Sequence, residues 1–166
     1  REETIAVRRK GKKRLLLGAL ILTLLAAGIG IMALGAGAAM APVKFDSDAW
    51  AAKCTAYTAE NRSRTLSDGT AVLTCGGFTG AEDLWNVPET TDKVTIDHAM
   101  TVGQGRAGLV LVSPDGTVIR LWEQEQPYTF SPAAGGMTRL RLIGDKGKNI
   151  EATITIRDGD GCWIVG

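Results

Sequence analysis

An uncharged run of 29 residues, from Leu15 to Val43, is the feature that most constrains the fold and location of this chain. About 20 consecutive apolar residues are enough for a helix to cross a bilayer core. A helix that is apolar on every side is not expected on the surface of a small soluble domain. We therefore expect a transmembrane helix over residues 15–41, with Pro42 marking its end.

Positive charge lies on one side of this run only. Six basic residues directly precede it, and no comparable cluster follows it. Because positively charged flanks stay in the cytoplasm, we expect residues 1–14 to form a basic cytoplasmic tail against anionic lipids and the later part of the chain to lie outside. The six residues are Arg8, Arg9, Lys10, Lys12, Lys13 and Arg14.

A cleaved signal peptide is the alternative interpretation of the same segment. It would combine the basic start with Ala39-Met40-Ala41 as a cleavage site of small residues. Against it, the apolar run is longer than the roughly 7–15 residues of a signal-peptide core. Cleavage after Ala41 would also leave Pro42 at the new terminus. We favour the uncleaved anchor and keep cleavage as an open alternative.

Small side chains recur along one face of the expected helix at spacings of three and four residues. Such a stripe lets two membrane helices approach closely, which suggests a homodimer through this face. Glycine and alanine are nevertheless so common in the segment that many faces of the helix would look small. The helix-packing candidates are Ala19, Thr23, Ala26, Gly30, Ala33 and Gly37.

Beyond the apolar run the chain is acidic, although its overall formal charge is only +1. Residues 44–166 carry twelve Lys and Arg against sixteen Asp and Glu, which argues against nucleic acid as a partner. We expect residues 42–49 to be a short tether, with Asp46 and Asp48 as linker charges. Residues 50–166 are then long enough to form one extracytoplasmic domain.

This outer domain shows the two-residue periodicity of β-strands. Apolar residues alternate with polar ones over 94–102 and over 150–156, which is typical of strands with one buried and one wet face. The run 109–112 is apolar on both faces, as in a central strand. Seven or so short strands predict an all-β fold, namely one antiparallel β-sandwich of the Ig-like or jelly-roll-like kind.

Turn residues separate the expected strands. Ser113-Pro114-Asp115-Gly116 is typical of a tight hairpin turn, because proline presets φ and glycine accepts a positive φ. Ser67-Asp68-Gly69 is a second such turn, and we expect it to join strands at 50–58 and 70–78. Further turns are expected at Ala134–Gly136 and Asp145–Lys148.

Several strand and turn patterns lie within residues 77–157: Gly77–Gly80, Asp92–Asp97, Leu109–Ile119 and Arg139–Lys148. Together they resemble an uncharacterised group of small membrane-anchored proteins of Firmicutes-type bacteria. In that group a basic start, one apolar segment and a compact extracytoplasmic β-sandwich recur. The resemblance covers about half of the chain, over residues 77–157. It implies fold and topology, and it implies no active site.

Three cysteines lie in the outer domain. Cys54 and Cys75 stand on either side of the Ser67-Asp68-Gly69 turn and would face an oxidising compartment outside the cytoplasm. A disulfide between them would close a loop of about 20 residues and stabilise the fold by about 3 kcal/mol in the chain-entropy model. Two half-buried thiols are the alternative. Cys162 is left over, either as a free thiol or as an intermolecular link.

The sequence offers little for catalysis. His98, the single histidine, falls on the apolar side of its expected strand, where a core histidine is commoner than a ligand or a base. Without paired His or Cys spacings we expect no metal site and no cofactor. The stretch 158–161 lacks the further oxygen ligands of a calcium loop, so we interpret it as a solvated turn. We therefore expect a protein that is not an enzyme.

Tryptophans are the candidate ligand-binding residues. We expect Trp85 and Trp163 to be exposed, so that their rings can stack on sugars. Trp122 falls in an expected strand and is predicted to lie in the core, whereas Trp50 would lie near the membrane interface.

Arginines suggest a second candidate surface. Alternation places several of them on the outer face of their strands, where an anionic polymer can reach them. Neighbouring glutamates make a solvated face of mixed charge the simpler interpretation. These residues are Arg120, Arg139, Arg141 and Arg157.

The sequence thus supports three hypotheses. The first is a single-pass membrane protein that presents a β-sandwich domain outside the cytoplasmic membrane and binds another envelope component without catalysis. The second is a module for carbohydrate or cell-wall polymer, with Trp85 and Trp163 as its platform. The third is an envelope enzyme, which would need a perturbed carboxylate or cysteine facing a cleft.

Overall fold

The computed structural model describes residues 41–165, which form one antiparallel sheet with very little helix. The predicted all-β class is thereby confirmed. The sheet has the strand order β1-β3-β7-β4-β5, while β2 and β8 pair with β3, and β6 pairs with β4. In chain order the elements are α2 (Asp48–Lys53), β1 (Tyr57–Glu60), β2 (Ser63–Ser67), β3 (Thr70–Pro88), β4 (Val94–Val112), β5 (Val118–Arg120), the 3-10 helix η1 (Leu121–Glu123), β6 (Tyr128–Phe130), β7 (Met137–Arg157) and β8 (Trp163–Ile164).

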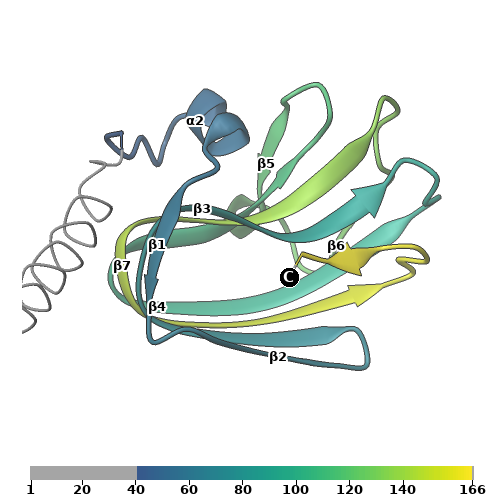
Figure 1. Ribbon diagram of the computed structural model, residues 1–166. Coiled ribbons are helices and arrows are strands. Elements are labelled where there is room, and N and C mark those ends of the chain that lie inside the picture. Colours follow the sequence, from purple (N-terminus) through teal and green to yellow (C-terminus); the bar gives the residue numbers. More distant parts are fainter. Residues whose placement is uncertain (1–40, 166) are drawn as a thin grey trace, which may run out of the picture. The chain divides into compact units, whose positions relative to one another are not determined.

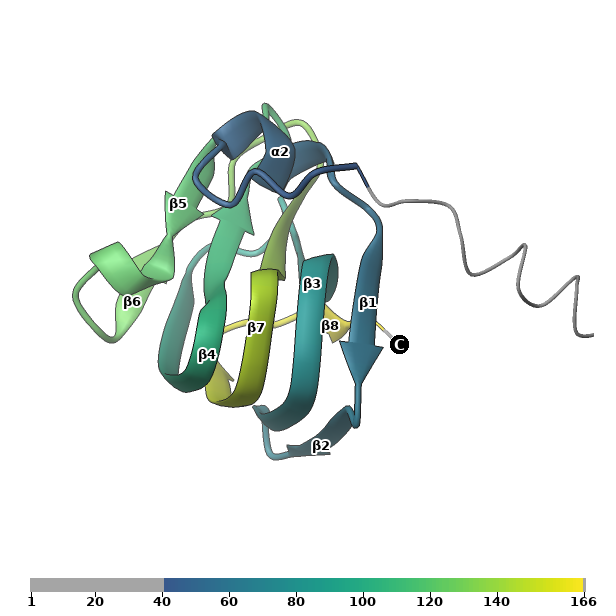
Figure 2. The same ribbon diagram turned by 90° about the vertical axis from the view of Figure 1, so that its left-hand side faces the viewer.

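Three long strands replace most of the short strands that the sequence suggests. β3, β7 and β4 span 19, 21 and 19 residues and pair along almost their whole length. All three curve back on themselves (Figure 1), and Figure 2 looks onto the outside of this bend. The single sheet is therefore folded into two halves that face each other as in a sandwich. We name the halves by their position relative to α2, which packs on one of them. The proximal half, against α2, comprises residues 81–88, 107–112 and 137–143. The distal half comprises residues 70–75, 94–102 and 150–157.

Glycine makes the bend possible. At Gly105 in β4, φ is +70°, and a Cβ built there would lie 2.0 Å from the carbonyl oxygen of Lys146 in β7. The register between the two strands also shifts at Arg106, as it does in a β-bulge. The turn predicted at Asp145–Lys148 is wrong, because this segment stays paired with both neighbouring strands and carries β7 through the bend.

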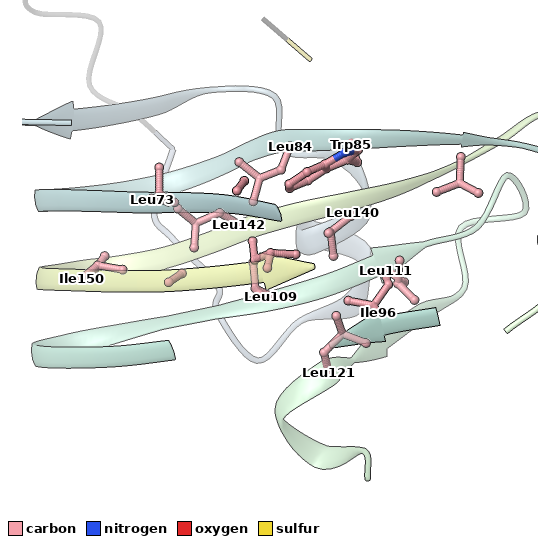
Figure 3. Packing of buried hydrophobic residues seen from close by; sticks show 14 of the residues in the cluster. Leu73, Leu84, Trp85, Ile96, Leu109, Leu111, Leu121, Leu140, Leu142 and Ile150 are labelled. Atoms are coloured by element: carbon pink, nitrogen blue, oxygen red, sulfur yellow. The ribbon is translucent and has the colours of Figure 1, made fainter. Parts of the chain in front are cut away.

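The main core lies between the two halves. Leu73 and Ile150 of the distal half share one cluster with Leu84 and Leu109 of the proximal half, and each is 1% exposed (Figure 3). Leu121 in η1 is fully buried and joins the same cluster. Burial of a side chain of this size stabilises a fold by roughly 1.5–3 kcal/mol. This shared core holds the folded sheet closed.

A second cluster covers the outer face of the proximal half. Ala51 of α2 is fully buried there, and Phe45 is 7% exposed, against Val110 and Ile143 of the sheet. The segment 42–49 therefore differs from the expected tether, because from Phe45 onward it is part of the folded domain.

Helix α2 also corrects the strand predicted at 50–58. Ser47 is the N-cap and accepts a hydrogen bond from the backbone nitrogen of Trp50 at 3.3 Å. Asp48 lies in the first turn, where a negative charge is favourable. The N-cap and the good helix formers alanine and lysine, at four of the six positions of α2, favour a helical turn here over a strand. Only the end of the predicted strand, from Tyr57, is extended, as part of β1.

The hairpin turns predicted at 67–69 and 113–116 are confirmed, although the first joins β2 to β3 and not the strand expected at 50–58 to β3. Asp68 and Gly69 connect β2 to β3 with φ values of 48° and 73°, which is the positive-φ pair of a two-residue hairpin. Ser113 donates its backbone N–H to the carbonyl oxygen of Thr117 and closes the β4–β5 hairpin at 2.9 Å. The run 109–112 is buried throughout, as expected of a central strand.

Among residues 41–165, no helix has the length and apolar character needed to cross a membrane. The predicted helix at 15–41 lies outside the described residues except for its last residue, as does the basic tail at 1–14. The helix-packing candidates also lie outside them, namely Ala19, Thr23, Ala26, Gly30, Ala33 and Gly37.

Candidate binding surface around Trp122

Trp122 is the exposed tryptophan among those whose side chains the structure describes, with 42% of its surface accessible. This corrects the predicted core position. The residue lies in η1, where the preceding Leu121 takes the buried position and turns Trp122 outward. The indole rests on Gly108 of β4, because a Cβ there would lie 2.2 Å from Cζ3 of the ring. A glycine at this position leaves the space that the indole occupies.

Stacked side chains extend from this indole. The ring of Phe45 lies 5.7 Å from that of Trp122, centroid to centroid, at an interplanar angle of 25°. The guanidinium carbon of Arg106 lies 4.2 Å from the Phe45 centroid, and that of Arg120 lies 6.0 Å from the Trp122 centroid. Such cation–π contacts contribute on the order of 0.5–1 kcal/mol at exposed sites. We call Phe45, Arg106, Gly108, Arg120 and Trp122 the Trp122 surface.

Two aspartates neutralise the arginines of the Trp122 surface. The Asp46 carboxylate accepts hydrogen bonds from both terminal nitrogens of Arg106, and Asp48 pairs with Arg120 at 2.6 Å. The hydrogen bond from Arg106 holds the pKa of Asp46 below its ordinary value. Asp46 and Asp48 are thus ion-paired to the sheet and not free linker charges. The surface combines an exposed aromatic ring with hydrogen-bonding groups whose charges balance.

The tryptophans predicted to stack on a ligand do not form such a platform. Trp85 is 5% exposed and belongs to the main core, together with the neighbouring Leu84. The register of β3 against β7 shifts between Asp83 and Trp85, so two consecutive residues face inward and simple alternation fails. Trp163 lies in β8 opposite Asn86, and its side chain is outside the described part of the structure.

The four arginines do not share one solvated face. Arg141 is 1% exposed and lies beneath α2, where it pairs with Asp83 and donates to the carbonyl oxygens of Ala51 and Cys54. Burial lowers the pKa of Arg141, and the negative charge of Asp83 opposes this. The alternating sequence predicts that this face of β7 is exposed to solvent. In the structure α2 covers it, so the buried position of Arg141 could not be predicted from the sequence.

The remaining three arginines lie in different surroundings. Arg139 donates to the carbonyl oxygen of Ala52 at 3.0 Å, and Arg120 belongs to the Trp122 surface. Arg157 lies on the distal half and pairs with Asp97 at 3.1 Å. The four arginines therefore do not form one continuous cationic surface.

Cys54 and Cys75 are free thiols, so the predicted disulfide does not form. Cys75 is 3% exposed within the main core, whereas Cys54 follows α2 and packs against the cluster on the outer face. The two side chains therefore lie on different sides of the sheet. Cys162 is also free, and burial raises the pKa of its thiol.

Within residues 41–165, no three His, Cys, Asp or Glu side chains gather as a metal site would require. His98 lies in β4 opposite Ile154 of β7, half-buried on the inner face. Its Nδ1 atom is covered and has no protein partner. Asp158, after β7, has a φ of 58°, in keeping with the predicted turn.

No protein-family model matches the chain, and no curated protein matches its sequence. The resemblance to small membrane-anchored proteins of Firmicutes-type bacteria stays a prediction.

Proposed function

We propose that this chain is a single-pass membrane protein whose all-β domain lies outside the cytoplasmic membrane and binds an envelope component there without catalysis. The uncharged run of residues 15–43 and its basic flank carry this proposal. The acidic domain with its exposed Trp122 surface supports a binding role, because Trp and Arg are the residues most enriched at binding hot spots.

Protease accessibility tests the topology. Protease is added to intact and to opened cells, and the membrane-bound product is detected through a tag at residue 1. We expect intact cells to lose the domain and keep a short membrane-bound fragment. A domain that stays protected until the cells are opened contradicts the orientation. A domain recovered without residues 15–41 contradicts the anchor and supports the cleaved signal peptide.

A carbohydrate or cell-wall polymer is the alternative ligand, and the position of Trp122 favours it. The C–H faces of sugar rings are apolar and pack on an aromatic ring, while their hydroxyl groups hydrogen-bond to charged side chains. Trp122 offers such a ring, with Arg120 and its partner Asp48 beside it. The sugar-stacking residue in this proposal is Trp122 and not Trp85, because Trp85 is buried.

A sedimentation assay with insoluble cell-wall polysaccharide tests this alternative. We expect Trp122→Ala to weaken binding by about tenfold or more, as loss of a hot-spot aromatic does. Leu66→Ala is the matched control, because Leu66 is 53% exposed in β2 and lies outside the Trp122 surface. Equal binding by wild type and Trp122→Ala would exclude a glycan platform at this surface.

A further inference from the structure

A hollow lies on the outside of the bend, over three neighbouring strands. β1, β3 and β7 run side by side there, and Figure 2 looks onto this face. The hollow has a volume of about 170 Å³, several times the roughly 30 Å³ that one water molecule occupies in the liquid. It can therefore hold a ligand of several heavy atoms. Its polar lining includes Thr58 and Glu60 of β1, Thr79 of β3, and Lys146 and Lys148 of β7, and Gly77 lies between them.

Glycine opens the hollow. Phe78 is 2% exposed in the main core, so the residues on either side of it turn outward. Gly77 pairs with Glu60 on one side and with Lys148 on the other. Because Gly77 has no side chain, nothing but backbone separates these two charged residues across β3. A Cβ at Gly77 would lie 3.0 Å from Oε2 of Glu60, so this carboxylate reaches over the glycine.

Two threonines line the hollow beside this row. Thr58 pairs with Thr79, and Oγ1 of Thr79 accepts a hydrogen bond from the backbone nitrogen of Lys146 at 3.2 Å. A hydroxyl group that accepts one hydrogen bond can still donate its proton to another group. Thr58 is exposed, and Thr79 is half-buried. The hollow therefore offers hydroxyl donors as well as charged groups.

The protein does not neutralise the charged groups of the hollow. None of the ion pairs within residues 41–165 includes Glu60, Lys146 or Lys148, and all three residues are exposed. By contrast, both arginines of the Trp122 surface are paired with aspartates. Two ammonium groups thus accompany one carboxylate, although residues 44–166 carry more acidic than basic residues overall. This lining favours a ligand that brings one negative charge.

The carboxylate of Glu60 restricts the class of ligand further. A simple anion would bring negative charge to Glu60 without offering it a donor, whereas a neutral sugar would leave both lysines without a counter-charge. Hydroxyl groups donate charge-assisted hydrogen bonds to a carboxylate. A ligand that carries both a carboxylate and hydroxyl groups satisfies the two kinds of charge in the lining.

We propose that the hollow binds a sugar acid, which is a monosaccharide unit that carries a carboxylate, either free or within an acidic polysaccharide. The ligand carboxylate accepts hydrogen bonds from the ammonium groups of Lys146 and Lys148. Its hydroxyl groups donate to the carboxylate of Glu60 and accept from Thr79. The inference is independent of the proposed membrane topology, and no residue of the Trp122 surface lines the hollow.

Ligand-observed NMR tests this site on the full chain, in a neutral detergent without a sugar headgroup. The probes are D-galacturonate, D-galactose and acetate. We expect saturable binding of galacturonate. Binding should be about tenfold or more weaker for galactose, which lacks the charge, and for acetate, which lacks the hydroxyl groups. Galacturonate without saturable binding would overturn the proposal, as would galactose or acetate that binds equally tightly.

Polygalacturonate distinguishes the two sources of the ligand. A polymer that displaces galacturonate identifies the ligand as a unit of an acidic polysaccharide. A polymer that does not displace it identifies a free sugar acid. Either result supports the sugar-acid class once galacturonate itself binds.

Lysine variants assign the binding to the hollow. Lys146→Gln and Lys148→Gln should each weaken galacturonate binding by about threefold or more, because each removes one charged donor. Lys93→Gln is the matched control, since Lys93 is an exposed lysine between β3 and β4 that does not line the hollow. Trp122→Ala should leave galacturonate binding unchanged, which separates this site from the proposed glycan platform. Binding that both hollow variants leave unchanged, or that Lys93→Gln or Trp122→Ala weakens equally, would contradict the site.

Discussion

Arg141 and Asp83 lie opposite each other on β7 and β3, and Nε of the buried guanidinium donates to Oδ1 of the carboxylate. The other nitrogens of Arg141 donate to carbonyl oxygens at the end of α2, on Ala51, Ala52 and Cys54. The last carbonyls of a helix lack partners within the helix, so this arginine satisfies them. One side chain thereby joins the helix to two central strands.

Arg141→Ala should therefore be strongly destabilising. The substitution leaves Asp83 and the α2 carbonyls without their donor, and breaking a buried ion pair costs about 3–5 kcal/mol of unfolding free energy. Urea unfolding followed by far-UV circular dichroism measures this. Arg157→Ala removes an exposed pair and should cost less than about 1 kcal/mol. Equal losses for the two variants would show that Arg141 does not have this structural role.

Gly105→Ala should be more destabilising than Gly116→Ala. Both glycines have a positive φ, of 70° and 88°, so both variants place alanine in a left-handed conformation at about 1–2 kcal/mol. A Cβ at Gly105 would also lie 2.0 Å from the Lys146 carbonyl oxygen, whereas one at Gly116 meets nothing within 4 Å. Crowding should add roughly 1–3 kcal/mol at Gly105, measured by urea unfolding. A smaller loss at Gly105 than at Gly116 would argue against a close approach of the strands at the bend.

Gly108→Ala should displace the indole of Trp122. A Cβ at this position would lie 2.2 Å from the ring, so we expect a loss of roughly 1–3 kcal/mol in unfolding free energy. In a Trp122→Ala background the clash is absent, and the same substitution should cost less than about 1 kcal/mol. Urea unfolding of the four chains of this double-mutant cycle measures the coupling. Additive effects would mean that Trp122 does not rest on Gly108.

Glu82 should make stability fall as pH rises. Burial raises its pKa above 4.5 in the folded chain, so the folded state holds this proton more tightly than the unfolded state does. The stabilisation by protonated Glu82 is fully present below 4.5 and is lost as pH rises through the folded pKa.

Glu82→Gln isolates this contribution. The unfolding free energy of wild type minus that of the variant should decrease between about pH 4 and about pH 7, measured by urea unfolding. Asp46 and Asp115 do not interfere, since the pKa of each is lowered from 3.8 and they titrate below this window. A difference that does not change with pH would contradict the raised pKa of Glu82.

The strands and hairpin turns were predictable because their signals are local. The alternation of apolar and polar residues at 94–102 and 150–156 indicates strands with one buried face. The turn at Gly69 was predictable because glycine accepts the positive φ that such a turn requires. The bend was not predictable in the same way. Gly105 lies within a continuous strand, and its role at the bend appears only once β4 and β7 are paired.

The candidate sites depended on contacts between distant parts of the chain. Trp85 is buried because a bulge places two consecutive residues on the inner face, and Trp122 is exposed because Leu121 takes the core position. Glu60 and Lys148 lie far apart in the sequence and line one hollow only because β1 and β7 both pair with β3. No local pattern marks such a pair.

By itself, the sequence determined the strand-rich class, the two hairpin turns and the uncharged run on which the membrane proposal rests, because each follows from the chemistry of neighbouring residues. The tertiary structure decided which faces are covered. Folding one sheet in half and docking α2 onto it bury Arg141 and Trp85 and leave Trp122 exposed. The physical reason is that burial depends on what packs against a strand, whereas alternation reports only that its two faces differ.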